Sequence, residues 1–146
     1  MKVTEQGFTL IEALCVLSIF LIISSVTAFS IKPQYERVQS EMFLNQLQTD
    51  LLYGQQYAIS HQQEVTVFIF PEEHYYFLRN TYIWPPFLLR NYSNAVSVSP
   101  GSLPLTFKFT PSGFVNKFGS LLIHSGSKQY RLTFLIGKGR FYVVEE

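Results

Sequence analysis

The chain has almost no cysteine and none of the short motifs that mark common catalytic sites. Cys15 is the single cysteine among 146 residues, so no intrachain disulfide can form and the fold must be stabilised by packing. The sequence contains no Gly-x-Ser-x-Gly, His-Glu-x-x-His or phosphate-loop pattern. The histidines His61, His74 and His124 are scattered. We therefore expect no catalytic activity and no bound metal or cofactor.

Acidic residues are absent from a long stretch of the second half. No Asp or Glu lies between His74 and Val144, whereas Lys, Arg, Tyr and Phe are interleaved there. Basic side chains bind phosphate and exposed rings stack on bases, so direct DNA contact is one interpretation. The stronger interpretation is that this stretch is an ordinary part of a folded domain, because its density of cations is usual and most of its rings are needed in a core. The candidates for DNA contact are Lys108, Lys117, Lys128, Arg131, Lys138 and Arg140.

The overall composition is that of a folded domain. Hydrophobic residues make up 47% of the chain, aromatic residues 16% and charged residues 14%, with a net charge of +1. These proportions exclude a disordered chain. Without residues 1–31, 115 residues remain, which is enough for one soluble domain with a modest core.

A long apolar run near the N-terminus contains one charge. Residues 8–31 span 24 positions, and Glu12 is the only ionisable carboxylate among them. A helix of this length rises about 36 Å, enough to cross the hydrocarbon core of a bilayer. A carboxylate inside a membrane helix costs roughly 2.5 to 3.5 kcal/mol on insertion scales. A chain that keeps such a group is expected to use it.

Two other interpretations of the N-terminus are weaker. A secretory signal could be cut after Ala28, leaving a mature chain that begins at Phe29. Against this, Glu12 interrupts the apolar run, the run exceeds the roughly 7 to 15 residues that signals need, and Glu5 partly cancels the basic start. An uncleaved signal anchor would share the helix but leave the Gly-Phe-Thr-Leu-Ile-Glu string of residues 7–12 unexplained.

The apolar period predicts one helix and then several strands. Residues 34–63 lack proline and are rich in helix-forming residues. The predicted buried stripe is Val38, Met42, Leu44, Leu47, Leu51, Tyr57 and Ile59, and the predicted polar side is Glu36, Arg37, Gln39, Glu41, Gln46 and Asp50. Gly54 either permits the close approach of a strand or is merely tolerated. The ranges with strand character are 64–70, 74–79, 82–84, 88–92, 95–99, 105–110, 121–124, 130–136 and 140–144. The order predicts an α+β fold, with a long N-terminal helix packed on an antiparallel sheet.

The string Gly7 to Glu12 resembles the N-terminal motif of the type IV pilin and pseudopilin family. The resemblance implies a leader peptide that a prepilin peptidase cuts between Gly7 and Phe8, followed by N-methylation of Phe8. It also implies that Glu12, the fifth residue of the mature chain, pairs with the amine of a neighbouring subunit during assembly. Opposite charges attract strongly where the dielectric constant is low. The implied domains are a leader at 1–7, a transmembrane helix at 8–31, an amphipathic helix continuing it at 32–63, and an antiparallel β-sheet domain at 64–146.

Both ends of the chain resemble one branch of that family, the minor pseudopilins of competence-type pili. Residues 47–63, with two Gln-Gln pairs and an Ala-Ile-Ser, carry the resemblance together with residues 137–144. It implies a structural subunit needed for uptake of external DNA, held in the cell membrane by one helix with its C-terminal domain outside, and found at the cell surface after assembly. The implied partners are other pilins, the prepilin peptidase, a platform protein and an assembly ATPase. Contact with DNA is expected to be indirect, although direct contact stays open. The alternatives are a minor pseudopilin of a type II secretion system (H class) and a membrane-anchored binding domain outside any filament.

Overall fold

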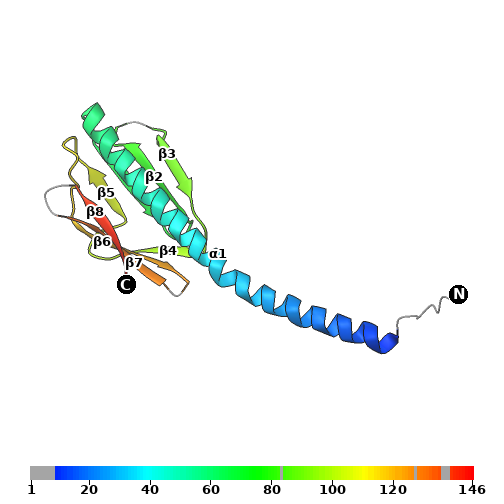
Figure 1. Ribbon diagram of the computed structural model, residues 1–146. Coiled ribbons are helices and arrows are strands. Elements are labelled where there is room, and N and C mark those ends of the chain that lie inside the picture. Colours follow the sequence, from blue (N-terminus) through cyan, green and yellow to red (C-terminus); the bar gives the residue numbers. More distant parts are fainter. Residues whose placement is uncertain (1–8, 83, 127, 136–138) are drawn as a thin grey trace. The chain divides into compact units, whose positions relative to one another are not determined.

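The protein consists of one long helix followed by eight strands. The computed structural model describes residues 9–82, 84–126, 128–135 and 139–146, with the side chains of 27–37 outside the description. The helix α1 spans Leu10–His61 (Figure 1). The strands are β1 (Val65–Phe70), β2 (Tyr75–Asn80), β3 (Leu88–Asn91), β4 (Val96–Pro100), β5 (Thr106–Phe109), β6 (Gly119–Ser125), β7 (Lys128–Phe134) and β8 (Phe141–Glu145). This order confirms the predicted α+β class.

The chain divides into two compact units, Met1–Tyr35 and Glu36–Glu146. The helix spans the division, so residues 36–61 of α1 belong to the same unit as all eight strands. The second unit therefore contains its own helical segment, against which the strands can bury their apolar side chains.

The strands form two four-stranded antiparallel sheets where the sequence predicted one. The first sheet has the order β3-β2-β1-β5 and the second the order β4-β6-β7-β8. Phe107 of β5 and Phe134 of β7 bring the inner faces of the two sheets together, with ring centroids 5.3 Å apart. Two small sheets can each turn one face towards the same helix, which a single flat sheet of eight strands cannot do.

The core lies between the second half of α1 and the inner faces of both sheets. Burial alternates along β2, where Tyr76 and Leu78 face inwards, and Val65, Val67 and Ile69 of β1 are buried with them. Thr66 of β1 is buried as well, on the other side of the strand. The second sheet contributes Val96, Val98, Leu121, Ile123, Tyr130, Leu132 and Phe134. The apolar side chains of both sheets therefore meet in one core with the helix.

The buried face of α1 differs from the predicted stripe. Leu44, Leu47 and Leu51 are buried as expected, but Val38 and Met42 are exposed. The face that packs on the sheets is Ser40, Phe43, Leu44, Leu47, Asp50, Leu51, Gly54 and Ala58. These eight positions follow the three- and four-residue steps of a helix closely. The prediction failed because small and polar residues hold half of the face, and hydrophobicity alone does not reveal them.

Gly54 brings α1 close to the first sheet. A Cβ atom at this position would overlap Cδ2 of Leu78 on β2 and touch Val65 on β1. Both neighbours are fully buried and have little room to move. Of the two explanations that the sequence left open for Gly54, the close approach of a strand is therefore confirmed.

The helix ends without a glycine. Gln62 takes a positive φ of 53° and its N–H bonds the carbonyl oxygen of Ile59. The N–H of Gln63 reaches back to the carbonyl oxygen of Ala58 at 3.2 Å. These two bonds form a Schellman motif, which satisfies carbonyl groups left open at a helix C-terminus and reverses the chain into β1.

The strand predicted at 82–84 is absent from its described residues. Tyr82 lies in a turn and Trp84 in a bend, while Ile83 lies outside the described residues. The side-chain oxygen of Asn80 accepts a hydrogen bond from the N–H of Tyr82 at 3.0 Å, as in an Asx turn. That local bond ends β2 and turns the chain before another strand can begin.

Candidate functional site

The first turn of α1 contains the predicted assembly residue. Thr9 precedes the helix, and its Oγ1 accepts a hydrogen bond from the N–H of Glu12 at 3.4 Å. The carbonyl oxygen of Thr9 accepts two more, from Glu12 and Ala13. Thr9 is thus an N-cap, and Glu12 places a negative charge at the positive end of the helix dipole. Gly7 and Phe8, the predicted cleavage and methylation residues, lie outside the described residues.

The side chains that follow Glu12 form an exposed apolar surface. Every side chain from 10 to 26 is exposed, including Phe20 at 64% and Ile22 at 63%. Glu12 is exposed as well, so its carboxylate is accessible to another molecule. Over the part of the chain that the structure describes, no helix is long and apolar enough for a bilayer crossing.

Three of the six predicted DNA-contact residues are held in ion pairs. Nζ of Lys108 lies 3.1 Å from Oε2 of Glu64, and Lys128 pairs with Glu145. Nε of Arg131 lies 2.7 Å from Oε1 of Glu146. The hydrogen bond from Arg131 also lowers the pKa of Glu146. Glu64, Glu145 and Glu146 lie outside the acid-free interval of the sequence. They nevertheless supply the carboxylates that pair with three basic side chains inside it.

The predicted cations also come from different parts of the fold. Lys108 belongs to β5 in the first sheet, whereas Lys128 and Arg131 belong to β7 in the second. Lys117 and Arg140 are exposed and lie outside the strands. Lys138 lies outside the described residues. The five described positions are thus divided between two sheets and their connections.

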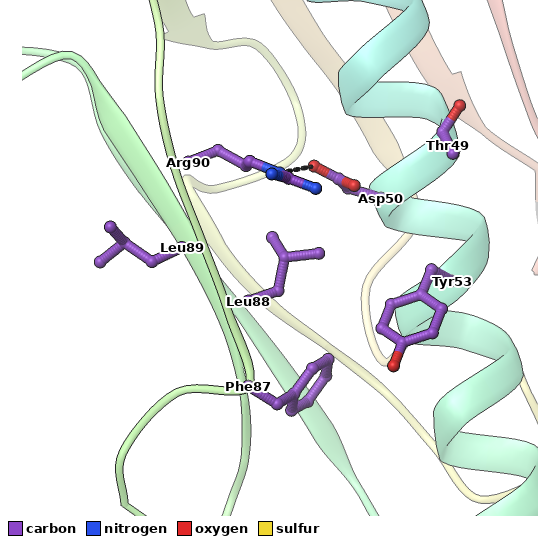
Figure 2. A pocket seen from close by; sticks show the side chains of 7 residues that line it. All are labelled: Thr49, Asp50, Tyr53, Phe87, Leu88, Leu89 and Arg90. Carbon is purple, nitrogen blue, oxygen red and sulfur yellow. Dashed lines mark hydrogen bonds and ion pairs between the residues drawn. The ribbon is translucent and has the colours of Figure 1, made fainter.

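Asp50 forms a buried polar cluster that the sequence did not reveal. Its side chain is 4% exposed, and Oδ2 accepts a hydrogen bond from the hydroxyl of Tyr76 at 2.7 Å. Nε of Arg90 lies 3.2 Å from the same oxygen (Figure 2). Gln46 donates to Oδ1 at 2.9 Å. Burial, with the hydrogen bond to Asp50, raises the pKa of Tyr76 well above its usual range.

A cleft of about 440 Å³ opens beside this cluster. Figure 2 shows Leu88 pointing from β3 towards α1, whereas Leu89 points the opposite way. The lining residues are Thr49, Asp50, Tyr53, Phe87, Leu88, Leu89 and Arg90. The carboxylate and the guanidinium of the cleft already bind each other, so they connect the helix to β3. Within the described residues, no three His, Cys, Asp or Glu side chains lie close enough to hold a metal ion.

Comparison with known proteins identifies the group to which the chain belongs. It is 30% identical over 139 residues to competence protein ComGD of Bacillus subtilis (strain 168), a match that covers 95% of this chain and 93% of that protein. The chain belongs to the ComGD family. This match confirms the resemblance to that branch of the family, which residues 47–63 and 137–144 indicated. The family model described as the prokaryotic N-terminal methylation motif matches residues 3–28, the segment with Gly7, Phe8 and Glu12.

The fold of this ComGD-like chain also matches a solved structure. The minor pseudopilin EpsH from the Type 2 Secretion System of Vibrio cholerae superposes with a TM-score of 0.60 over 73% of this chain and 96% of that one. The sequence identity is 15%, so the match establishes the pilin-like α+β fold. The predicted fold is confirmed, and the sequence identifies the branch of the family.

Sequence reasoning missed Asp50 because it assigned every charged residue of the helix to solvent. A signal was present in the spacing. Ser40, Leu47, Asp50, Gly54 and Ala58 fall on one helix face. Small residues at three of those positions indicate close packing, and Asp50 lies among them. A buried carboxylate needs a donor from a distant element, and Tyr76 supplies one.

Proposed function

We propose that this protein is a minor pseudopilin of a competence-type pilus, a structural subunit that supports the uptake of external DNA. The observation that supports this most directly is the 30% identity to competence protein ComGD across 95% of the chain. The role is structural and not enzymatic, because the proposal rests on a pilin-like fold and a pilin-type N-terminus.

The proposed processing takes place at the N-terminus. A prepilin peptidase removes residues 1–7 by cutting between Gly7 and Phe8, and the new amine of Phe8 is methylated. The match of residues 3–28 to the methylation motif supports this assignment. Residues 8–31 then anchor the chain in the cell membrane as a single pass, with the domain from 32 to 146 outside, until assembly moves it to the cell surface.

The proposed assembly step uses Glu12. Its carboxylate is exposed in the first helical turn, so the N-terminal amine of a neighbouring pilin can approach it. An unpaired charge among apolar helices is poorly solvated, and pairing with an opposite charge removes much of that cost. The exposed apolar side chains from 10 to 26 would be covered by neighbouring helices in the filament. The other partners are the platform protein and the assembly ATPase, and DNA contact is indirect.

A minor pseudopilin of a type II secretion system is the second candidate, because the solved structure with this fold comes from such a system. Deleting the gene separates the two. The competence proposal expects loss of transformation with normal secretion of exported proteins. Loss of secretion with normal transformation would support the second candidate and contradict the first.

Mass spectrometry of the mature N-terminus tests the processing step separately. We expect a chain that begins with methylated Phe8. An intact Met1, or a chain that begins at Phe29, would contradict pilin processing and favour a membrane-anchored domain outside any filament.

A further inference from the structure

The outer face of the first sheet is covered with aromatic rings. Phe68 and Phe70 of β1 point away from α1, as do Tyr75 and Phe77 of β2, because residues that alternate with the buried ones face outwards. We call these four residues, with Trp84 and Leu89 at their margin, the aromatic face. Trp84 is 69% exposed and Leu89 54%. The four ring residues are partly exposed, and contiguous apolar surface of this kind on a folded domain marks an interaction site.

The rings of the aromatic face are stacked on one another. Phe68 and Phe77 face each other in the register, with ring centroids 4.8 Å apart and planes inclined by 26°. Phe70 and Tyr75 are also opposite, at 4.8 Å and 16°. Cross-strand rings that stack in this way cover each other's faces and present their edges to solvent. Because sugars and nucleobases bind to ring faces, the aromatic face suits apolar side chains better.

One cation, Arg79, lies within the aromatic face. Its guanidinium carbon is 5.1 Å from the ring centre of Phe68 and 5.9 Å from that of Trp84. Its Nε atom is buried and has no hydrogen-bond partner among the described residues. None of the ion pairs in the described part of the chain includes Arg79. The nearest cation on the neighbouring strand, Lys108, is already paired with Glu64.

The charge of the aromatic face indicates what would cover it. None of the six residues that define the face is charged, and the guanidinium of Arg79, which lies against Phe68 and Trp84, is in none of the ion pairs among the described residues. The same face of a second copy would bring a charge of the same sign. Nucleic acid needs several cations to neutralise its phosphates, and only one unpaired cation is present. A complementary surface is therefore apolar and supplies a carboxylate.

We propose that the aromatic face binds the globular domain of a different protein through an apolar surface that contains an Asp or Glu side chain, and that this carboxylate pairs with Arg79. Arg is a frequent anchor of protein interfaces when its charge is paired and aromatic rings flank it. The proposal does not depend on the assignment to a competence pilus, because it uses only the surface of the domain.

Site-specific photo-cross-linking in the cells that make the protein tests this proposal on the full chain. The photoreactive residue p-benzoylphenylalanine replaces Leu89, which points outwards beside Phe77 in the register. The control places it at Tyr142, which is 46% exposed on the second sheet. We expect the Leu89 variant to give one discrete protein cross-link whose mapped peptide contains an Asp or Glu among apolar residues. The control should not yield that product.

Charge reversal then tests the role of Arg79. We expect Arg79→Glu to reduce the cross-link yield about tenfold or more, because a paired interface charge is replaced by a repelling one. Exchanging the mapped carboxylate of the partner for Lys should restore it. An unchanged thermal unfolding midpoint of Arg79→Glu separates lost binding from lost folding.

Four results would overturn the proposal. They are a cross-link from Leu89 to a second copy of the chain, a cross-link to nucleic acid, the absence of any product, and a yield that Arg79→Glu leaves unchanged in a folded protein.

Discussion

Among single residues, Asp50 is expected to have a large effect on stability because its carboxylate joins α1 to β2 and β3. Asp50→Ala removes the acceptor of the buried Tyr76 hydroxyl and the partner of Arg90. An unsatisfied buried hydroxyl costs about 1 to 3 kcal/mol. Arg90 is half exposed and can return to water, so the loss of its partner adds little. We expect the free energy of unfolding, measured by urea titration, to fall by about 2 to 3 kcal/mol.

A matched control uses the same carboxylate. Gln46 is exposed and donates to the other oxygen of Asp50, so Gln46→Ala should cost less than about 0.5 kcal/mol. If Asp50→Ala were no more destabilising than Gln46→Ala, the cluster would contribute little to the fold.

At the same scale, Glu12 is predicted to act in assembly and not in processing. Glu12→Ala should leave the predicted cleavage after Gly7 largely intact, since Glu12 lies four residues beyond Phe8 in the sequence. It should reduce the number of pili, because the amine of the neighbouring subunit loses its partner in a medium of low dielectric constant. Electron microscopy gives pilus numbers, and immunoblotting distinguishes the cut chain from the precursor.

Replacing Gly7 should have the opposite effect and leave an uncut precursor in the membrane. Normal pilus numbers in Glu12→Ala would contradict the pairing argument, whatever the outcome at Gly7.

Among the secondary-structure elements, α1 depends on Gly54 for its distance from the first sheet. Gly54→Ala would gain about 1 kcal/mol of helix propensity. The added methyl group would, however, push against Leu78 in a filled core, and such overpacking costs about 1 to 3 kcal/mol. We expect a lower melting temperature for Gly54→Ala by differential scanning calorimetry. Gln56→Ala, on the exposed side of the helix, should change it little or raise it.

For the whole molecule, we expect the distribution of charge to limit how tightly the protein binds DNA. Glu145 and Glu146 pair with Lys128 and Arg131, so their carboxylates neutralise two of the basic side chains of the second sheet. Changing both acids to Gln would remove the carboxylates that pair with two cations of one strand, Lys128 and Arg131 of β7. We expect this double variant to bind duplex DNA more tightly than the native protein in filter-binding assays at low salt, with the difference lost at high salt.

Glu72 and Glu73 provide the matched control, since both are exposed and lie in the turn between β1 and β2. Changing them to Gln alters the net charge by the same amount without releasing Lys128 or Arg131. Equal gains in DNA binding for the two double variants would show that net charge alone matters.

Much of the fold was predictable because the local pattern of apolar residues along the chain indicates which segments form a helix and which form strands. The β-branched and aromatic residues of 64–70 predicted β1, and the range 130–136 predicted most of β7. The strand predicted at 82–84 does not form among its described residues, since a side-chain bond from Asn80 turns the chain there and competes with the strand pattern. Hydrophobicity placed Met42 in the core, but the exposed position of Met42 shows that apolar character alone does not decide which face of a helix is buried.

The sequence by itself determined the class of the protein, because a lone acid near the start of an apolar run and the order of one helix followed by strands are properties of the linear chain. The tertiary structure decided which helix face is buried, the division into two sheets, the position of Asp50 between Tyr76 and Arg90, and the pairing of basic side chains with distant acids. It also decided that the rings of β1 and β2 stack together on an outer face. These features depend on contacts between residues far apart in the chain, which periodicity does not specify.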